Sequence, residues 1–189
     1  MFWNRSMPQP SGERLNSDGA MEVLRDGIRV HVRRVRKEDT DLEREFIEGL
    51  SPESRRSRFL ASISSPSDSL LKGLTDLDES KEAAFIALLT EAGKEHEVGV
   101  ARFSADPGGS AEIAVAVDDH WQAKGLATLL MRHLIELARE RGVERLYSVD
   151  FASNHKMHEL MAHLGFTSHP DPTDATLLVH SLDLRSSPP

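Results

Sequence analysis

The stretch AEIAVAVDDHWQAKGLATLLMRHLIELARERG, residues 111–142, decides the fold because its hydrophobic pattern changes once within it. Residues 111–119 are a short apolar run that predicts a strand. Apolar residues then recur at the spacing of an amphipathic helix, at Leu126, Leu130, Leu134 and Leu137. Gly142 marks the predicted end of that helix. A further strand is predicted over residues 145–151, and this strand–helix–strand order indicates parallel neighbours in one sheet.

The loop QAKGLAT, Gln122 to Thr128, joins the predicted strand to the predicted helix. Backbone N–H groups in the first turn of a helix have no intrahelical partner and carry the positive end of its dipole, so a phosphate or pyrophosphate is their natural guest. Gly125 and Ala127 keep the approach free of bulk, and Lys124 adds charge. A Walker A loop and a G-x-G-x-x-G fingerprint are both absent from the sequence. On these residues alone, a plain strand-to-helix turn tightened by glycine explains the loop equally well.

The rest of the chain predicts one α/β (α+β) domain over residues 28–184, with a mixed central sheet of about six to seven strands and helices on both faces. Before the loop, an antiparallel meander is predicted over residues 83–90, 96–105 and 111–119, preceded by a strand from Ile28 and short helices from Asp39, Ser51 and Leu70. After residue 151, a helix from Asn154, a short strand beyond Gly165 and a last strand over residues 175–184 are predicted. A flexible polar tail, residues 1–27, and a short C-terminal tail, residues 185–189, are expected to flank this domain.

Composition excludes several classes of protein. A chain of 189 residues with 39% hydrophobic and 29% charged residues is typical of a globular domain. No run approaches the roughly 18 apolar residues of a membrane span, and the first residues lack the apolar core of a secretory signal. The absence of cysteine removes disulfides, zinc–cysteine sites and cysteine nucleophiles, and is compatible with the reducing cytoplasm, where we expect the protein. A net charge of −8 argues against nucleic-acid binding, which depends on neutralising phosphates.

Several segments, in order, resemble the GNAT superfamily of acyl-CoA N-acyltransferases. Residues 111–146 resemble that family's strand, pyrophosphate loop and helix, and NHKMHELMAHLGF, residues 154–166, resembles its second cofactor motif ending in L-G-F. Upstream, LSPESRRSRF and LTDLDESKEAAFIAL, residues 50–59 and 74–88, resemble the acetyltransferase domain of bacterial Pat-type protein-lysine acetyltransferases. The resemblance covers residues 28–184 and leaves out the tails.

The resemblance implies a GNAT fold and an N-acetyltransferase that moves an acetyl group from acetyl-CoA to an amine by direct transfer in a ternary complex. The amine would belong to a protein lysine or to a small molecule. In the family, the third meander strand splays from its parallel neighbour, and the pantetheine arm pairs with the splayed backbone, which corresponds here to residues 113–117. The implied cofactor-binding residues are Val115, Ala116 and Val117 on the strand, Gln122, Ala123, Lys124, Gly125, Leu126, Ala127 and Thr128 in the loop, and Asn154 at the next helix.

Catalysis needs a base, because an amine of lysine type has a pKa of about 10.4 and attacks only when neutral. Glu112 is the catalytic candidate, since it matches the glutamate that Pat-like enzymes place on this strand. The competing interpretation is an edge-exposed strand residue. Many GNAT enzymes protonate the leaving thiolate with a tyrosine four residues before the L-G-F glycine, but that position is Met161 here. Water, Ser153 or His155 would then supply the proton, or no dedicated acid exists.

Other readings of the same residues stay open. A GNAT module that binds acetyl-CoA without catalysis, and that regulates or binds a partner, is the alternative function. Arg55, Arg56 and Arg58 are usually a solvated face, but they could meet an acidic patch on a partner protein. His155, His158 and His163 share one segment, yet their spacing does not suit a closed metal site, and no metal is expected. The protein is expected to be a monomer or a homodimer.

Overall fold

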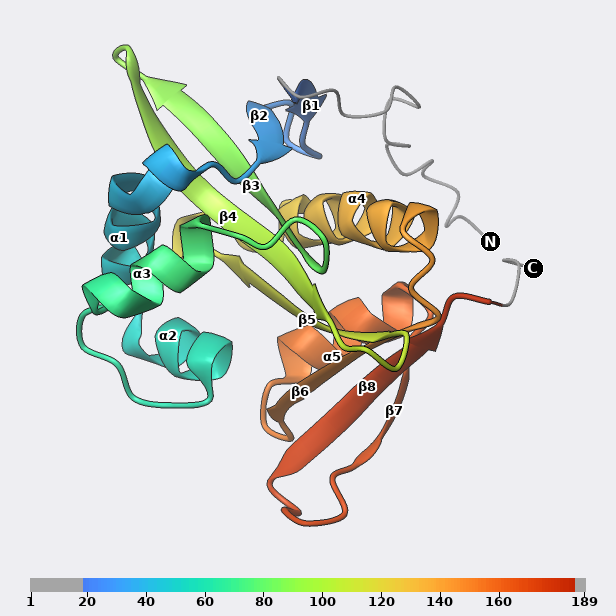
Figure 1. Cartoon of the computed structure of the whole chain (residues 1–189). Helices are drawn as coiled ribbons and strands as arrows, with labels where there is room; N and C mark the ends of the chain where they lie inside the picture. Colours follow the sequence, from blue (N-terminus) through green and yellow to red (C-terminus); the bar gives the residue numbers. More distant parts are fainter. Residues whose placement is uncertain (1–18, 186–189) are drawn as a thin grey trace, which may run out of the picture.

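The structure is a computed structural model and describes residues 19–185. Its centre is one eight-stranded sheet in the order β1-β2-β3-β4-β5-β6-β8-β7 (Figure 1). The strands are β1 (Ala20–Val23), β2 (Arg29–Arg34), β3 (Glu82–Glu91), β4 (Lys94–Ala105), β5 (Ser110–Val117), β6 (Arg145–Phe151), β7 (Thr167–Pro170) and β8 (Leu177–Asp183). The helices are α1 (Thr40–Gly49), α2 (Pro52–Phe59), α3 (Asp68–Thr75), α4 (Leu126–Glu140) and α5 (His155–His163), with short 3-10 turns η1 (Lys37–Asp39) and η2 (Asp119–Trp121).

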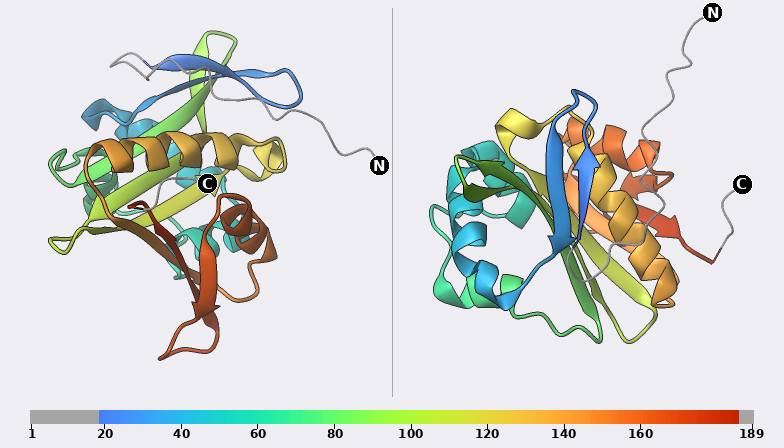
Figure 2. Two further views of the ribbon diagram at one scale, coloured as in Figure 1. Left: turned by 90° about the vertical axis from the view of Figure 1, so that its right-hand side faces the viewer. Right: turned by 90° about the horizontal axis from the view of Figure 1, so that it is seen from above.

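The predicted mixed sheet with helices on both faces is confirmed, although the sheet has more strands than expected. Neighbouring strands run antiparallel throughout except β5 and β6, which are parallel. Helices α1, α2 and α3 lie on one side of the strands and α4 on the other (Figure 2). No helix within the described residues is long and apolar enough to cross a membrane.

The additional strand is β1, which lies inside the segment expected to be a tail. Ala20–Val23 pairs with β2, so the prediction was wrong for these residues, while residues 1–18 lie outside the described part of the chain. The local sequence gave little signal because the strand is short and its apolar residues Met21 and Val23 are exposed. The inward residue is Glu22, whose Oε1 lies 3.1 Å from Nε2 of His133 on α4. A tertiary contact therefore holds this strand, rather than an apolar pattern.

Two hydrophobic cores fill the two sides of the sheet. The larger one lies under α4 and α5 and includes the fully buried Leu130, Leu134 and Met161. The smaller one lies under α1 and α3 and is formed by Phe46, Ile47, Leu50, Leu71, Leu74, Ile86, Leu88 and Val100. Gly99 lets α4 pack directly on β4, because a Cβ there would lie 3.2 Å from side-chain carbons of both Leu126 and Leu130.

The parallel pair β5–β6 is joined only at its beginning. The register pairs Ser110 with Arg145, Ala111 with Leu146 and Glu112 with Tyr147, and stops there. Beyond this point β5 stays paired with β4 as far as Val117, and β6 stays paired with β8 as far as Phe151. The strands therefore separate, as the resemblance implied, and we call the gap between residues 113–117 and 148–151 the fork. Glu112 is the last paired residue at its closed end.

Candidate functional site

A cavity of about 480 Å³ lies at the open end of the fork. Its walls come from the end of β5, the loop before α4, the first turn of α4, and helices α2 and α5. Most of the residues predicted to bind the cofactor line it: Val115, Ala116, Val117, Gln122, Ala123, Gly125, Leu126, Ala127, Thr128 and Asn154. The structure thus brings together the strand and loop segments that the sequence singled out.

The N-terminus of α4 faces this cavity without a side-chain cap. Gly125 is the N-cap residue, with φ +89°, and as a glycine it has no side chain that could accept a hydrogen bond from the first turn. Glycine suits the position because its backbone is left-handed and because a Cβ would lie 3.2 Å from Nε of Arg25. Ala123 is also left-handed, with φ +61°, which is uncommon for a residue with a side chain. The N–H groups of this turn can therefore donate hydrogen bonds to an anionic ligand.

Lys124, the cation predicted to serve this loop, contacts Asp26 and Trp121 instead of the cavity. Lys124 does not line the cavity; its Nζ lies 3.1 Å from Asp26 Oδ2 and 4.6 Å from the centre of the Trp121 ring. The hydrogen bond from Lys124 lowers the pKa of the Asp26 carboxyl.

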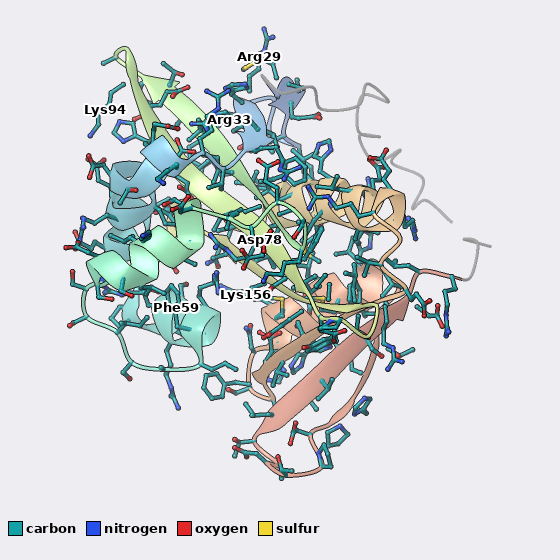
Figure 3. All side chains as sticks on the ribbon, in the orientation of Figure 1. Arg29, Arg33, Phe59, Asp78, Lys94 and Lys156 are labelled. Atoms are coloured by element: carbon teal, nitrogen blue, oxygen red, sulfur yellow. The ribbon has the colours of Figure 1, made fainter. Side chains whose placement is uncertain are left out.

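Arg25, Arg58 and Lys156 place positive charge on the cavity wall, and Arg25 and Lys156 were not predicted from the sequence. Arg25 comes from the turn between β1 and β2. Lys156 lies in the first turn of α5 (Figure 3), and its Nζ donates to Gln122 Oε1 over 2.8 Å. The sequence around Arg25 or Lys156 does not predict this position, since each residue reaches the loop only through tertiary packing.

Side chains at the start of the loop tie it to helix α2. Asp119 accepts hydrogen bonds from the backbone N–H of Ser51 at 2.9 Å, from Ser51 Oγ at 3.0 Å and from Ser54 Oγ at 2.8 Å. Burial raises the pKa of Asp119, but these hydrogen bonds outweigh it and leave the pKa below its ordinary value. Gln122 Nε2 donates to the carbonyl of Val117 at 3.3 Å, so the loop is also fixed to the end of β5.

The other predicted residues have structural partners of their own. Asn154 Oδ1 accepts from the backbone N–H of Met157 at 3.2 Å and so caps α5, while the residue also lines the cavity. Met161, at the family's tyrosine position, is fully buried in the larger core. Ser153 and His155, the alternative proton donors, are exposed and do not line the cavity. Within the described residues, no group of three or more His, Cys, Asp or Glu side chains could hold a metal ion.

Glu112 is exposed and lies at the closed end of the fork, outside the cavity wall. Alternation along β5 places it on the same face as Ala116, which packs against the core under α1 and α3. The cavity residue that senses its charge is Arg58 of α2. Burial, reinforced by Arg102, lowers the pKa of Arg58 to about 10, while Glu112 and two other carboxylates act in the opposite direction.

A buried group of charges lies on the same face of the sheet. Arg102 Nη2 is 3.5 Å from Oε1 of Glu43 on α1, and Arg102 Nη1 donates to the carbonyl of Leu74 on α3 at 3.2 Å. Glu97 is 7% exposed, and neither of its carboxylate oxygens has a hydrogen-bond partner. Burial raises the pKa of Glu43 and, more strongly, that of Glu97. Both carboxyls are therefore biased towards the neutral form.

Comparisons with known proteins agree with this geometry. The model of the Acetyltransferase (GNAT) family matches residues 47–166. The acetyltransferase PA5475 of Pseudomonas aeruginosa is 43% identical over 171 residues, which cover 90% of this chain and 92% of that protein. The crystal structure of the GNAT domain of Streptomyces lividans Pat matches with a TM-score of 0.79 and 28% identity, over 87% of this chain and 96% of that one. The structure of yncA from Salmonella typhimurium with its cofactor acetyl-CoA has the same fold, with a TM-score of 0.62 and 19% identity over 85% and 96% of the two chains.

Proposed function

Since the chain belongs to the GNAT acetyltransferase family and is an acyltransferase, we propose that it moves the acetyl group of acetyl-CoA to an amine by direct transfer in a ternary complex. The observation that carries this proposal is the fork, which is closed at Glu112 and leads through the cavity to the uncapped N-terminus of α4. A thioester held in the fork would have its diphosphate at the helix and its acyl group near the carboxylate.

The residues present suit a coenzyme A thioester. The amides of residues 125–128 would hold the diphosphate, and Arg25 and Lys156 would add positive charge. Within the described residues, no strand pairs with residues 113–117 of β5 on the side of the fork, so this edge offers backbone groups to the amides of the pantetheine arm. Asn154 would stand beside that arm.

Glu112 would act as the general base. It would take the proton that the amine must lose before its nitrogen attacks the thioester carbonyl carbon. When the C–S bond breaks, the thiolate would be protonated from water, because Met161 is a core residue and offers no proton. With no cysteine in the chain, an acyl-cysteine intermediate is excluded and direct transfer remains.

Incubation of labelled acetyl-CoA with a panel of amines and protein lysines tests the proposal. Glu112→Gln should lower kcat/KM by about 10²–10⁴-fold, most near neutral pH, while coenzyme A binding measured by calorimetry persists. Glu136→Gln, an exposed glutamate on α4, is the matched control and should retain activity. Unchanged transfer by Glu112→Gln would remove Glu112 as the base. Binding of coenzyme A without transfer to any amine would favour the alternative, a non-catalytic acetyl-CoA-binding module.

A further inference from the structure

Arg58 is the one member of the basic run Arg55, Arg56 and Arg58 that lines the cavity. Arg55 Nη1 donates to the carbonyl of Ser64 at 2.7 Å, and the Arg56 guanidinium lies 4.7 Å from the centre of the Phe151 ring. The three arginines therefore have different surroundings, and only Arg58 reaches the cavity wall. Arg58 projects from the last turn of α2 towards the fork.

The guanidinium of Arg58 has no hydrogen bond or ion pair to any residue within the described part of the chain. It lies 4.9 Å from the centre of the ring of its neighbour Phe59. Other arginines on this side of the sheet are paired: Arg33 donates to both oxygens of Asp39, and Arg102 meets Glu43. The N–H donors of this half-buried guanidinium are therefore available to a ligand in the cavity.

Arg58 lines the cavity at the open end of the fork. The charge of Glu112 on β5 acts to raise the pKa of Arg58, and the charge of Arg58 acts to lower the pKa of Asp150 on β6; these two carboxylates point to opposite faces of the sheet. Arg102, Glu43 and Glu97 also act on the pKa of Arg58. Burial biases Glu43 and Glu97 towards their neutral forms, so they offset little of the positive charge at Arg58.

We propose that Arg58 binds a carboxylate of the substrate at the fork, so that the enzyme selects substrates that carry one. A guanidinium presents parallel N–H donors that match the two oxygens of a carboxylate. The inference rests on the proposed function, because only then does the fork hold the reacting groups. Glu112 would receive the amine and Arg58 the carboxylate, and this pair of opposite charges matches the zwitterion of a free amino acid. The same contact would serve a carboxylate at the end of a dicarboxylic acyl group.

Two sets of matched substrates test the proposal and separate the two sources of the carboxylate. The first compares phenylalanine with phenethylamine, and lysine with cadaverine, using acetyl-CoA as donor. The second compares succinyl-CoA with acetyl-CoA, using phenethylamine as acceptor. We expect the carboxylate-bearing member of one set to be favoured in kcat/KM by about ten- to a hundredfold, the usual effect of a hydrogen bond to a charged group. The set that shows the preference identifies the acceptor or the acyl group as its source.

Variants of Arg58 then assign the preference to its guanidinium. The ratio of kcat/KM between the carboxylate-bearing substrate and its matched partner should fall close to one in Arg58→Gln and should be partly retained in Arg58→Lys. Calorimetry should still detect coenzyme A binding in both variants. Arg56→Gln, in the same helix and outside the cavity, should keep the wild-type ratio. If Arg58→Gln does not fold, the kcat/KM ratios of the wild-type protein and of Arg58→Lys still test the proposal.

Two outcomes would overturn the inference. The wild-type protein could show no preference in either set, or Arg58→Gln could slow both members of a set equally. These outcomes differ from failure of the proposed function, which would appear as no acetyl transfer to any amine.

Discussion

Glu97 shows how much a single residue's surroundings matter in this protein. It sits on β4 with both carboxylate oxygens buried and unpartnered, close enough to Glu43 and Arg102 to sense their charges. Burial, reinforced by Glu43, raises the pKa of Glu97 well above the ordinary value of 4.5. The folded protein therefore holds this proton over a pH range in which the unfolded chain has lost it. A neutral Glu97 is the form that the fold accommodates.

This raised pKa predicts a pH-dependent loss of stability. Because the folded state binds the proton more tightly, the free energy of unfolding should fall as pH rises above 4.5 towards the folded-state pKa. Glu97→Gln should remove that contribution, so the variant should be more stable than the wild type at pH 8 and closer to it at pH 5. Urea unfolding at both values measures the difference. Glu91→Gln, at the exposed end of β3, is the control, and an identical pH profile for the two variants would contradict the prediction.

Helix α4 both completes the hydrophobic core and presents its N-terminus to the cavity. Its apolar face covers β4 closely, since a Cβ at Gly99 would lie 3.2 Å from side-chain carbons of Leu126 and Leu130. Its N-terminus faces the cavity, with glycine as the N-cap residue. The same packing that completes the core therefore orients the amides that we propose hold the diphosphate.

Substitutions at Gly125 separate the two tasks. Gly125→Ala places a methyl group in a left-handed backbone and near Arg25, which should cost about 1 kcal/mol of stability. Gly125→Glu adds a carboxylate that competes with a diphosphate for the same amides. Coenzyme A should raise the melting temperature of Gly125→Ala but not of Gly125→Glu, since stabilisation grows as RT ln(1 + [L]/Kd). Equal thermal shifts in the two variants would remove this turn from the binding site.

The molecule as a whole assembles its cavity from segments far apart in the sequence. The turn between β1 and β2 brings Arg25 to the N-terminus of α4, and the contact between Glu22 and His133 holds β1 against that helix. On the other side, Asp119 joins the loop to the start of α2, the helix that carries Arg58. The cavity therefore depends on the packing of the β1–β2 turn and of helix α2 against the loop before α4.

A substitution of Arg25 tests whether the β1–β2 turn contributes to coenzyme A binding. Arg25→Gln should weaken coenzyme A binding by about tenfold at low ionic strength, and by less in high salt, because screening reduces the effect of an exposed charge. Arg29→Gln makes the same change of charge at the start of β2, where Arg29 pairs with Val23 and does not line the cavity, and should leave the affinity unchanged. Calorimetric titrations at two salt concentrations measure both variants. Equal losses of affinity would assign the effect to net charge rather than to the position of Arg25.

The sequence by itself determined the order of the elements and the backbone part of the candidate site. The switch from strand to helix within residues 111–142, the meander before it and the loop around Gly125 all depend on local periodicity and turn residues, which act over a few neighbours. For the same reason, the strand and loop residues predicted to meet the cofactor line one cavity, except Lys124. Backbone groups are positioned by the element to which they belong.

Only the tertiary structure decided which side chains complete that site. It directs Lys124 to Asp26 and Trp121, buries Met161 in the core, and places Arg25, Lys156 and Arg58 on the cavity wall. It also adds β1, whose inward residue is a glutamate, and ends the pairing of β5 and β6 at Glu112. These outcomes depend on contacts between residues far apart in the chain, whose free energies outweigh local preferences and leave no trace in local periodicity.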